Sequence, residues 1–289
     1  VKNAYDADSK SCIISLLPFE KEIIINDESV LTKGIKVIVS DTGHGMTFET
    51  VTEKWMVPST DDKLVREISP KGRIMQGKKG IGRYSASMIG DDMVLQTIDK
   101  TGDLTTLYLI WKDFEEAKYL EDVDVLIENF KTTRSSGTEI IMVGDENHLN
   151  DWDEKQLKNL KSELKKLIPP IDKEVNKIDD DTENFKITLQ LGKFPFENYS
   201  NYKEDIEPYP LFELFDYRIS GVVTNEGNAN LKFENKRIKN SPPEILREFK
   251  ILLNQVKEKN TQSYCGDVNV DFRVFDRDPS SIDGLIERG

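Results

Sequence analysis

A short apolar segment that runs straight into an acidic, glycine-rich turn constrains the fold of this chain more than any other feature. Residues 35–41, IKVIVSD, are apolar at positions 35, 37, 38 and 39, which predicts a buried strand. The turn DTGHGM follows at once. At a strand exit the Asp41 carboxylate can accept a hydrogen bond from an exocyclic amine, and Gly43 and Gly45 allow a base to lie close to the backbone. A plain strand-exit turn is the alternative reading.

Length and composition set the scale of the molecule. A chain of 289 residues is long for a single domain, so two domains are expected. A hydrophobic content of 37%, with 13 Phe and 9 Tyr, is enough to fill a core. The net charge is −13, from 40 Lys and Arg against 53 Asp and Glu. This charge argues against a broad DNA-coating surface and leaves open a local basic groove.

The cysteines and histidines exclude several kinds of site. Cys12 and Cys265 are far apart and outside any metal-binding spacing, so we expect two reduced thiols in a cytoplasmic protein. His44 and His148 are the only histidines, which excludes a His-rich metal centre.

The apolar runs are too short for a membrane span, so no membrane association is expected. No signal-peptide pattern opens the sequence.

A second glycine-rich stretch, GKKGIGRYS at 77–85, leads into a predicted helix. Glycines at a helix N-terminus expose backbone N–H groups to an anion, and the helix dipole favours negative charge there. The stretch does not end in G-K-[ST] as a Walker motif does, and no βαβ unit surrounds it as in a Rossmann motif. It predicts a phosphate cradle, with a flexible loop as the alternative.

Two further stretches carry polar groups at the ends of predicted elements. The opening VKNAYDADSK reads as the last part of a helix, with Asn3 and Asp6 on one face. The Asn3 side-chain oxygen suits a hard cation such as Mg²⁺, and Asp6 could bind water or a nucleotide. In SSGTEIIM, Thr138 begins a late strand, where its hydroxyl could hold a purine directly or through water.

In this order and spacing, NAYDAD, DTGHGM, GKKGIGRYS and GTEI resemble the N box, G1 box, G2 box and adenine-side motif of the GHKL ATPases. That superfamily includes DNA gyrase B, the ninety-kilodalton heat-shock chaperones, sensor histidine kinases, MutL and MORC proteins. The resemblance covers about residues 1–191. It implies an α/β (α+β) Bergerat fold, in which a mixed sheet carries helices on one face and holds ATP beneath a mobile lid.

The resemblance also implies roles for single residues. Asp41 would take the adenine amino group, and Asn3 would bind Mg²⁺. The polar stretch Ser59 to Gln76 would be the ATP lid. The expected nucleotide-binding residues are Asn3, Asp6, Asp41, Gly43, Gly45, Met46, Lys79, Gly80, Ile81, Gly82 and Thr138.

The resemblance places the general base outside the sequence. In the ATP-hydrolysing branch a Glu lies four residues before the Asn of the N box and polarises the attacking water. That position precedes Val1, and we expect the Glu in the full-length protein.

Periodicity and capping signals predict the remaining elements of the first domain. A helix over 150–170 is expected from a leucine stripe, with Asn150 or Asp151 as its cap. A helix is also expected at 48–57. Strands are expected at 11–19, 35–41, 93–98, 104–112, 137–143 and 185–191, with a short extended piece at 23–26.

A change of composition between Pro195 and Pro210 suggests a domain boundary. We expect an ATP-binding domain at 1–195 and a smaller α/β transducer-like domain at 196–289. The second would hold strands at 217–223, 230–233 and 267–275 and a helix at 242–259.

Related proteins send a Lys or Arg from this second domain into the γ-phosphate site. Arg277 follows a predicted strand and is the candidate for that catalytic role, with Lys232 and Lys236 as rivals. A solvated loop arginine is the alternative reading of Arg277.

Three functional readings follow. The first is an ATPase in which Mg²⁺ and ATP close the lid and form a homodimer, acting on a protein or DNA client that the sequence does not identify. The second is the catalytic domain of a histidine kinase, although no upstream helical pair with a phospho-acceptor His is visible. The third is a nucleotide-gated scaffold that does not hydrolyse ATP.

Overall fold

The computed structural model of the chain divides into two units: the first comprises Val1–Ile168 and Asp179–Glu207, and the second comprises Pro169–Ile178 and Pro208–Gly289. Each is described by itself. The structure describes residues 1–25, 28–55, 67–77, 84–117, 123–169, 185–210, 212, 214–226, 228–238, 244–245, 249–250, 266–276 and 278–279.

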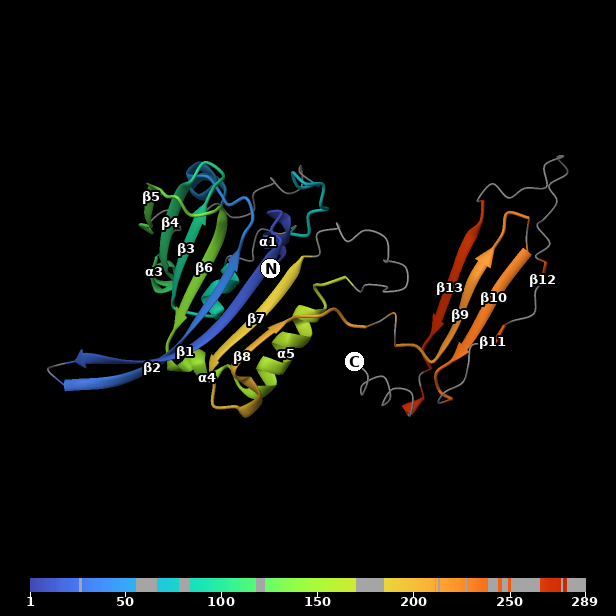
Figure 1. The fold of residues 1–289 in the computed structure, drawn as a ribbon. Coiled ribbons are helices and arrows are strands. Elements are labelled where there is room, and N and C mark those ends of the chain that lie inside the picture. The colour runs from blue at the N-terminus through green and yellow to red at the C-terminus, as the bar shows by residue number, and fades with distance from the viewer. Residues whose placement is uncertain are drawn as a thin grey trace. The chain divides into compact units, whose positions relative to one another are not determined.

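The first unit is built on one twisted eight-stranded sheet in the order β5-β4-β3-β6-β2-β1-β7-β8 (Figure 1). Every neighbouring pair is antiparallel except β1 and β7, which are parallel. The sheet is therefore mixed, as the sequence predicted. Its strands are β1 (Ser11–Ile25), β2 (Glu28–Asp41), β3 (Asp92–Ile98), β4 (Asp103–Ile110), β5 (Leu126–Lys131), β6 (Gly137–Gly144), β7 (Lys186–Lys193) and β8 (Ser200–Asp205).

The first two strands form a hairpin that is longer than expected. The sequence predicted a strand at 11–19 and a short extended piece at 23–26, but β1 is one continuous strand because each residue from Cys12 to Ile25 pairs with β2. β7 pairs with β1 only as far as Leu16, and β6 pairs with β2 only from Ile35 on. The outer part of the hairpin therefore extends beyond its neighbours as a two-stranded arm (Figure 1).

Helices are few and short in the described residues. The predicted helix over 150–170 corresponds to α5, which begins at Glu154 because Asp153 caps it by accepting from Gln156 N at 2.7 Å. A separate short helix, α4, precedes it and has Asp145 as its cap. Neither Asn150 nor Asp151 is the cap. The elements are α1 (Lys2–Asp6), α3 (Trp111–Glu116), α4 (Glu146–Asn150) and α5 (Glu154–Lys165), with single helical turns η1 (Thr50–Trp55), η2 (Tyr84–Met88) and η4 (Glu197–Tyr199).

Two further elements of the first sheet differ from the prediction. The segment 104–112 was expected to be one strand, but β4 ends at Ile110 and α3 begins at Trp111. The strand β5 was not expected, because LIENFK is exposed or half-buried along its whole length and gives no apolar pattern. Helical structure at 48–55 agrees with the expectation for that segment.

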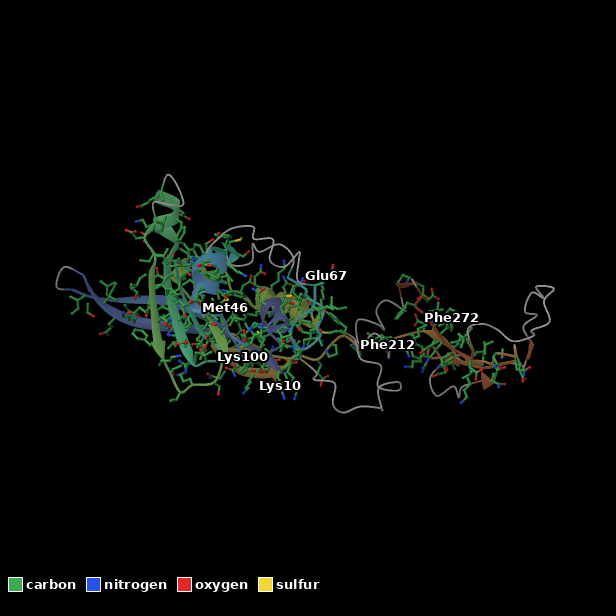
Figure 2. The ribbon with its side chains drawn as sticks, turned by 90° about the horizontal axis from the view of Figure 1, so that it is seen from above. Lys10, Met46, Glu67, Lys100, Phe212 and Phe272 are labelled. Atoms are coloured by element: carbon green, nitrogen blue, oxygen red, sulfur yellow. The ribbon has the colours of Figure 1, made fainter. Side chains whose placement is uncertain are left out.

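The core of the first unit lies against the sheet. Leu16, Ile35, Leu95 and Leu107 are fully buried on four strands, and Leu157 of α5 is buried in the same cluster. Burial of aliphatic side chains is the main stabilising contribution in such a core. Figure 2 shows the side chains of both units, with Met46 labelled in the first and Phe272 in the second.

The division of the chain at Glu207 and Pro208 lies within the stretch from Pro195 to Pro210 in which the composition changes. The strand β8 pairs with β7 from Thr188↔Asp205 to Lys193↔Ser200 and so extends the first sheet into that stretch. An ATP-binding domain at 1–195 and a transducer-like domain at 196–289 stay a prediction.

The second unit contains an antiparallel sheet in the order β11-β10-β9-β13, with β12 also paired to β10. Its buried Arg218 donates to both oxygens of Asp271 at 3.0 and 3.1 Å, which ties β9 to β13. The strands are β9 (Tyr217–Val223), β10 (Asn228–Asn235), β11 (Glu244–Ile245), β12 (Phe249–Lys250) and β13 (Val268–Val274).

The described residues between 242 and 259 form strands, whereas a helix was predicted for that range. Residues 244–245 and 249–250 are short strands, because each pairs with β10. The other residues of that range, and Arg277, lie outside the described part of the chain. Lys232 is exposed, and the Lys236 Nζ lies 3.9 Å from the centre of the Phe215 ring.

Candidate functional site

Asp41 ends β2 between two neighbouring strands. Its Cα partners are Cys12 on β1 and Thr138 on β6, and its Oδ1 accepts a hydrogen bond from Gly43 N at 2.8 Å. Burial raises the pKa of the Asp41 carboxyl, and the backbone N–H groups of Gly43 and Thr138 partly offset this increase. The carboxyl is thus a half-buried acceptor at the strand exit, as the sequence predicted.

The glycines of the turn are required by the protein's own backbone. Gly45 has φ +66°, and a Cβ there would lie 1.9 Å from the Ile98 carbonyl oxygen. A Cβ on Gly43 would lie 2.7 Å from both Cβ and the carbonyl oxygen of Ala7. Glycine therefore allows the turn to pack tightly between α1 and the end of β3. A role of either glycine against a base stays a prediction.

A buried threonine that the motifs did not reveal completes this part of the site. Thr97 on β3 is fully buried, and its Oγ1 accepts from Met46 N at 2.8 Å. The hydroxyl oxygens of Thr97 and Thr138 are 3.1 Å apart. The only sequence signal for Thr97 was a polar residue within a predicted strand.

A second hydroxyl joins the turn to the segment after α1. Ser9 is fully buried, and its Oγ donates to Ser11 O at 2.7 Å and accepts from Thr42 N at 2.9 Å. His44 N donates to Ala7 O at 3.0 Å. The N-box and G1-box segments are therefore hydrogen-bonded to each other directly.

The two N-box side chains lie in different environments. Asn3 is exposed on α1, where its side-chain oxygen could serve as one hard ligand of a cation. Asp6 is buried, and its carboxylate oxygens accept from Gln76 N at 2.8 Å and Gly77 N at 3.0 Å. Asp6 thus holds the start of the glycine-rich loop. A direct contact of Asp6 with a nucleotide stays a prediction.

The structure brings part of the predicted set together. Asp41, Gly43, Met46 and Thr138 lie in one bonded cluster with Thr97, and Gly45 packs on the end of β3. Lys79, Gly80, Ile81 and Gly82 lie outside the described residues, as do residues 59–66 of the predicted lid.

Residues 67–77 at the C-terminal end of the predicted lid are held in place. Ile68 and Ile74 form a β-bridge, and Ser69 N donates to Arg73 O at 2.8 Å. These contacts give residues 67–77 a defined structure, and the mobility of the lid stays a prediction.

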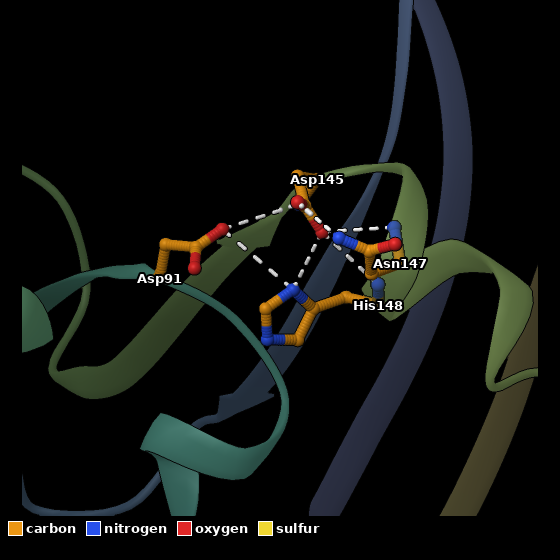
Figure 3. Close-up of polar contacts among 4 residues, drawn as sticks. All are labelled: Asp91, Asp145, Asn147 and His148. Atoms are coloured by element: carbon orange, nitrogen blue, oxygen red, sulfur yellow. Dashed lines mark hydrogen bonds and ion pairs between the residues drawn. The ribbon is translucent and has the colours of Figure 1, made fainter.

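Among the described residues, one group of carboxylate and imidazole ligands lies close enough together to hold a metal ion, formed by Asp91, Asp145 and His148 (Figure 3). His148 Nδ1 lies 2.9 Å from Asp145 Oδ1 and 3.6 Å from Asp91 Oδ2. Asp145 also accepts from the backbone N–H groups of Asn147 and His148, so the cap of α4 accounts for the arrangement. Asp145 and His148 follow Gly144, the last residue of β6, whereas Thr138 lies at the beginning of that strand.

A known family matches the segment that carries most of this cluster. A mixed sheet places an acceptor carboxylate, a glycine turn and a hydroxyl pair beside a short helix that carries an exposed Asn. Residues 1–139 match the family described as histidine kinase-, DNA gyrase B-, and HSP90-like ATPase. This part of the chain is therefore similar to the GHKL ATPases.

Individual solved structures are also similar to the chain. The chain is similar to the solved ATPase region of topoisomerase II from Saccharomyces cerevisiae at 12% identity, with a TM-score of 0.40. The similar part covers 65% of this chain and 45% of that one, so this chain spans less than half of the solved structure. No curated protein matches the chain. No helix in the described residues is long and apolar enough to cross a membrane.

Proposed function

We propose that the first unit binds Mg²⁺–ATP and that the full-length protein hydrolyses it. The observation that carries the proposal is the half-buried Asp41 carboxylate at the exit of β2, beside the hydroxyl pair of Thr97 and Thr138. An ionised carboxylate is an acceptor only, whereas a threonine hydroxyl both donates and accepts. This set suits the amino group and ring nitrogens of adenine.

The same chemistry disfavours guanine. Adenine offers an N6 amino donor where guanine presents its O6 acceptor. A carboxylate that faces O6 would place two acceptors together without a proton between them. The proposed site therefore selects adenine nucleotides over guanine nucleotides.

The phosphate side of the site rests on α1 and the glycine-rich loop. Asn3 is an exposed residue, and its side-chain oxygen would supply one ligand to Mg²⁺, while water and phosphate oxygens would fill the remaining positions. The Asp6 carboxylate fixes Gly77, where the loop begins. When bound, Mg²⁺ neutralises charge that develops on the phosphoryl oxygens. Lys79, Gly80, Ile81 and Gly82 would contribute to phosphate binding.

The larger cycle is proposed from the superfamily. ATP binding would close the lid and pair two copies of the chain, and hydrolysis would reopen them. The base would be the Glu expected four residues before Asn3, and a basic residue of the second unit, with Arg277 as the candidate, would reach the γ-phosphate. The client would be a protein or DNA.

Titration calorimetry with ATP and with GTP, each with and without Mg²⁺, tests the binding step. ATP should bind more tightly than GTP, and Mg²⁺ should strengthen ATP binding. Equal affinity for the two nucleotides would remove Asp41 from the adenine site. In the full-length protein, ATP should yield inorganic phosphate without a phosphohistidine product. A phosphohistidine would instead support a kinase.

A further inference from the structure

Asp8 of the N-box segment binds a loop more than sixty residues away in sequence. It is buried, and its Oδ1 accepts from Ser69 Oγ at 2.5 Å while its Oδ2 accepts from Lys71 N at 3.2 Å. Ser69 is buried as well, and its Oγ in turn accepts from Arg73 N at 2.9 Å. A buried carboxylate is costly unless it is hydrogen-bonded, so these contacts are needed to keep Asp8 in place.

The same loop returns a cation to the helix. Arg73 Nη1 donates to the carbonyl oxygens of Ser9 at 2.7 Å and Tyr5 at 3.2 Å. Its guanidinium carbon lies 4.8 Å from the centre of the Tyr5 ring and 6.0 Å from that of Phe185. Carbonyls at the C-terminal end of a helix lack partners within the helix, and a basic side chain satisfies them.

The contacts are therefore reciprocal. Asp6 and Asp8 hold backbone N–H groups of the loop, and Arg73 of the loop holds backbone carbonyls of the helical segment. The small hairpin that begins at Glu67, labelled in Figure 2, is closed by Met75 N donating to Glu67 O at 2.9 Å. These contacts tie the end of α1, the helix that carries Asn3, to the loop.

We propose that Asp6, Asp8, Ser69 and Arg73 form a latch that positions α1 relative to the loop before a nucleotide binds. The latch fixes Asn3 and Gly77, the two points at which the proposed site meets Mg²⁺ and phosphate. Asp8 is thus a positioning residue, and it contacts neither base nor phosphate. This role rests on the proposed function and deepens it.

The backbone of Asp8 offers a matched pair of variants. Its φ of +58° lies in the left-handed region, which Gly and Asn both tolerate and Ala does not. Asp8→Gly removes the carboxylate, whereas Asp8→Asn keeps one oxygen acceptor for Ser69 or Lys71. A difference between these two variants therefore reports the lost hydrogen bonds and not backbone strain.

Hydrogen exchange without nucleotide tests the latch itself. The amides of Lys71, Arg73, Gln76 and Gly77 should be protected in the wild-type protein, because each donates to a latch side chain. In Asp8→Gly they should exchange at least about tenfold faster, with β2 amides unchanged. In Asp8→Asn they should stay closer to wild type. Unprotected amides in the wild-type protein would overturn the latch, as would equal protection in all three proteins.

Binding of ATP and of adenosine tests what the latch positions. Asp8→Gly should weaken ATP binding in Mg²⁺ by about tenfold and leave adenosine binding within about twofold, because adenosine lacks the phosphates. Asp145→Ala, which removes the cap of α4 far along β6, serves as a control for general destabilisation and should change neither affinity. An equal loss for ATP and adenosine, or no loss for ATP, would overturn the positioning role. A wild-type protein that binds no ATP would overturn both the proposed function and the positioning role, while the exchange experiment would still decide whether the latch exists.

Discussion

Thr97 and Thr105 occupy directly opposed positions on β3 and β4, and both are fully buried. Their hydroxyls differ, because Thr97 Oγ1 accepts from Met46 N at 2.8 Å, whereas Thr105 Oγ1 has no hydrogen-bond partner in the described part of the chain. The Thr97 hydroxyl therefore connects β3 to the turn that carries Met46, whereas the Thr105 hydroxyl contributes only volume to the core.

Replacing each threonine by valine should separate these roles. Thr97→Val leaves Met46 N without its acceptor and should lower the free energy of unfolding by about 1–3 kcal/mol. Thr105→Val removes a hydroxyl that is buried without a partner and should be neutral or slightly stabilising. Urea denaturation with unchanged m-values checks both variants. Equal losses would show that the Thr97 contacts contribute nothing beyond volume.

Asp41→Asn should weaken ATP binding. The amide keeps the size of the side chain but can present a donor to the adenine N6 donor. The loss of a charge-assisted bond should cost about 2–3 kcal/mol, roughly 30- to 150-fold in affinity. Calorimetric titration with ATP measures it, and an unchanged affinity would contradict the assignment.

Asp41→Asn should also change the stability of the nucleotide-free protein, in a way that depends on pH. Burial raises the pKa of Asp41 above its usual 3.8. A raised carboxyl pKa stabilises the fold below the pKa of the unfolded chain, and this contribution is lost as pH rises through the folded value. Asn does not titrate, and its oxygen can still accept from Gly43 N. The variant should therefore gain stability relative to wild type as pH rises from about 3 to neutral. Urea denaturation at a series of pH values measures the difference, and a constant difference would argue against the titration of Asp41.

Two glycines with positive φ offer a matched test of close packing. A Cβ at Gly72, where φ is +88°, would meet nothing within 4 Å, so Gly72→Ala should cost only the backbone term of about 1–2 kcal/mol. At Gly45 a Cβ would also strike the Ile98 carbonyl. Gly45→Ala should cost at least about 3 kcal/mol and should impair ATP binding. Thermal unfolding and calorimetry compare the two, and similar losses would show that the turn can move away from β3.

Asn3→Ala tests the proposed cation ligand. Removal of one hard oxygen should weaken nucleotide binding selectively when Mg²⁺ is present, and water would replace the lost ligand only in part. Metal-free ADP binding should stay near wild type, because Ala favours the helix. In the full-length protein, turnover should fall further than binding. If affinity shifted by the same factor with and without Mg²⁺, Asn3 would have only a structural role.

Local pattern predicted much of the first sheet. The runs at 35–41, 93–98 and 137–143 correspond to β2, β3 and β6, because buried strands need near-continuous apolar residues. The strand β5 was not predicted, because it lies at the edge of the sheet and is largely exposed, so its sequence has no apolar pattern. The start of α5 at Glu154 was predicted too early, because Asp153 competes with Asn150 and Asp151 as a capping residue of the same chemical kind.

Some residues of the candidate site were also predictable from local sequence, and others were not. Asp41, the two glycines of its turn and Thr138 were identified from motifs whose residues are close in sequence. Thr97 and Asp8 were not, because their importance arises from contacts with distant segments: strand register brings Thr97 to Thr138, and loop packing brings Asp8 to Ser69. Such contacts leave no mark on local residue patterns.

The parallel pairing of β1 with β7 has a consequence for the order of folding. The β1–β2 hairpin is local and can form within microseconds, like other hairpins. Pairing of Leu16 with Leu191 closes a loop of 191 − 16 = 175 residues, and contacts of such long sequence separation slow folding. During synthesis, β1 must therefore wait with one edge uncovered until β7 has emerged from the ribosome. For that interval the growing chain carries an exposed β-edge in its first unit, so its yield in the cell should depend on chaperones that shield such edges.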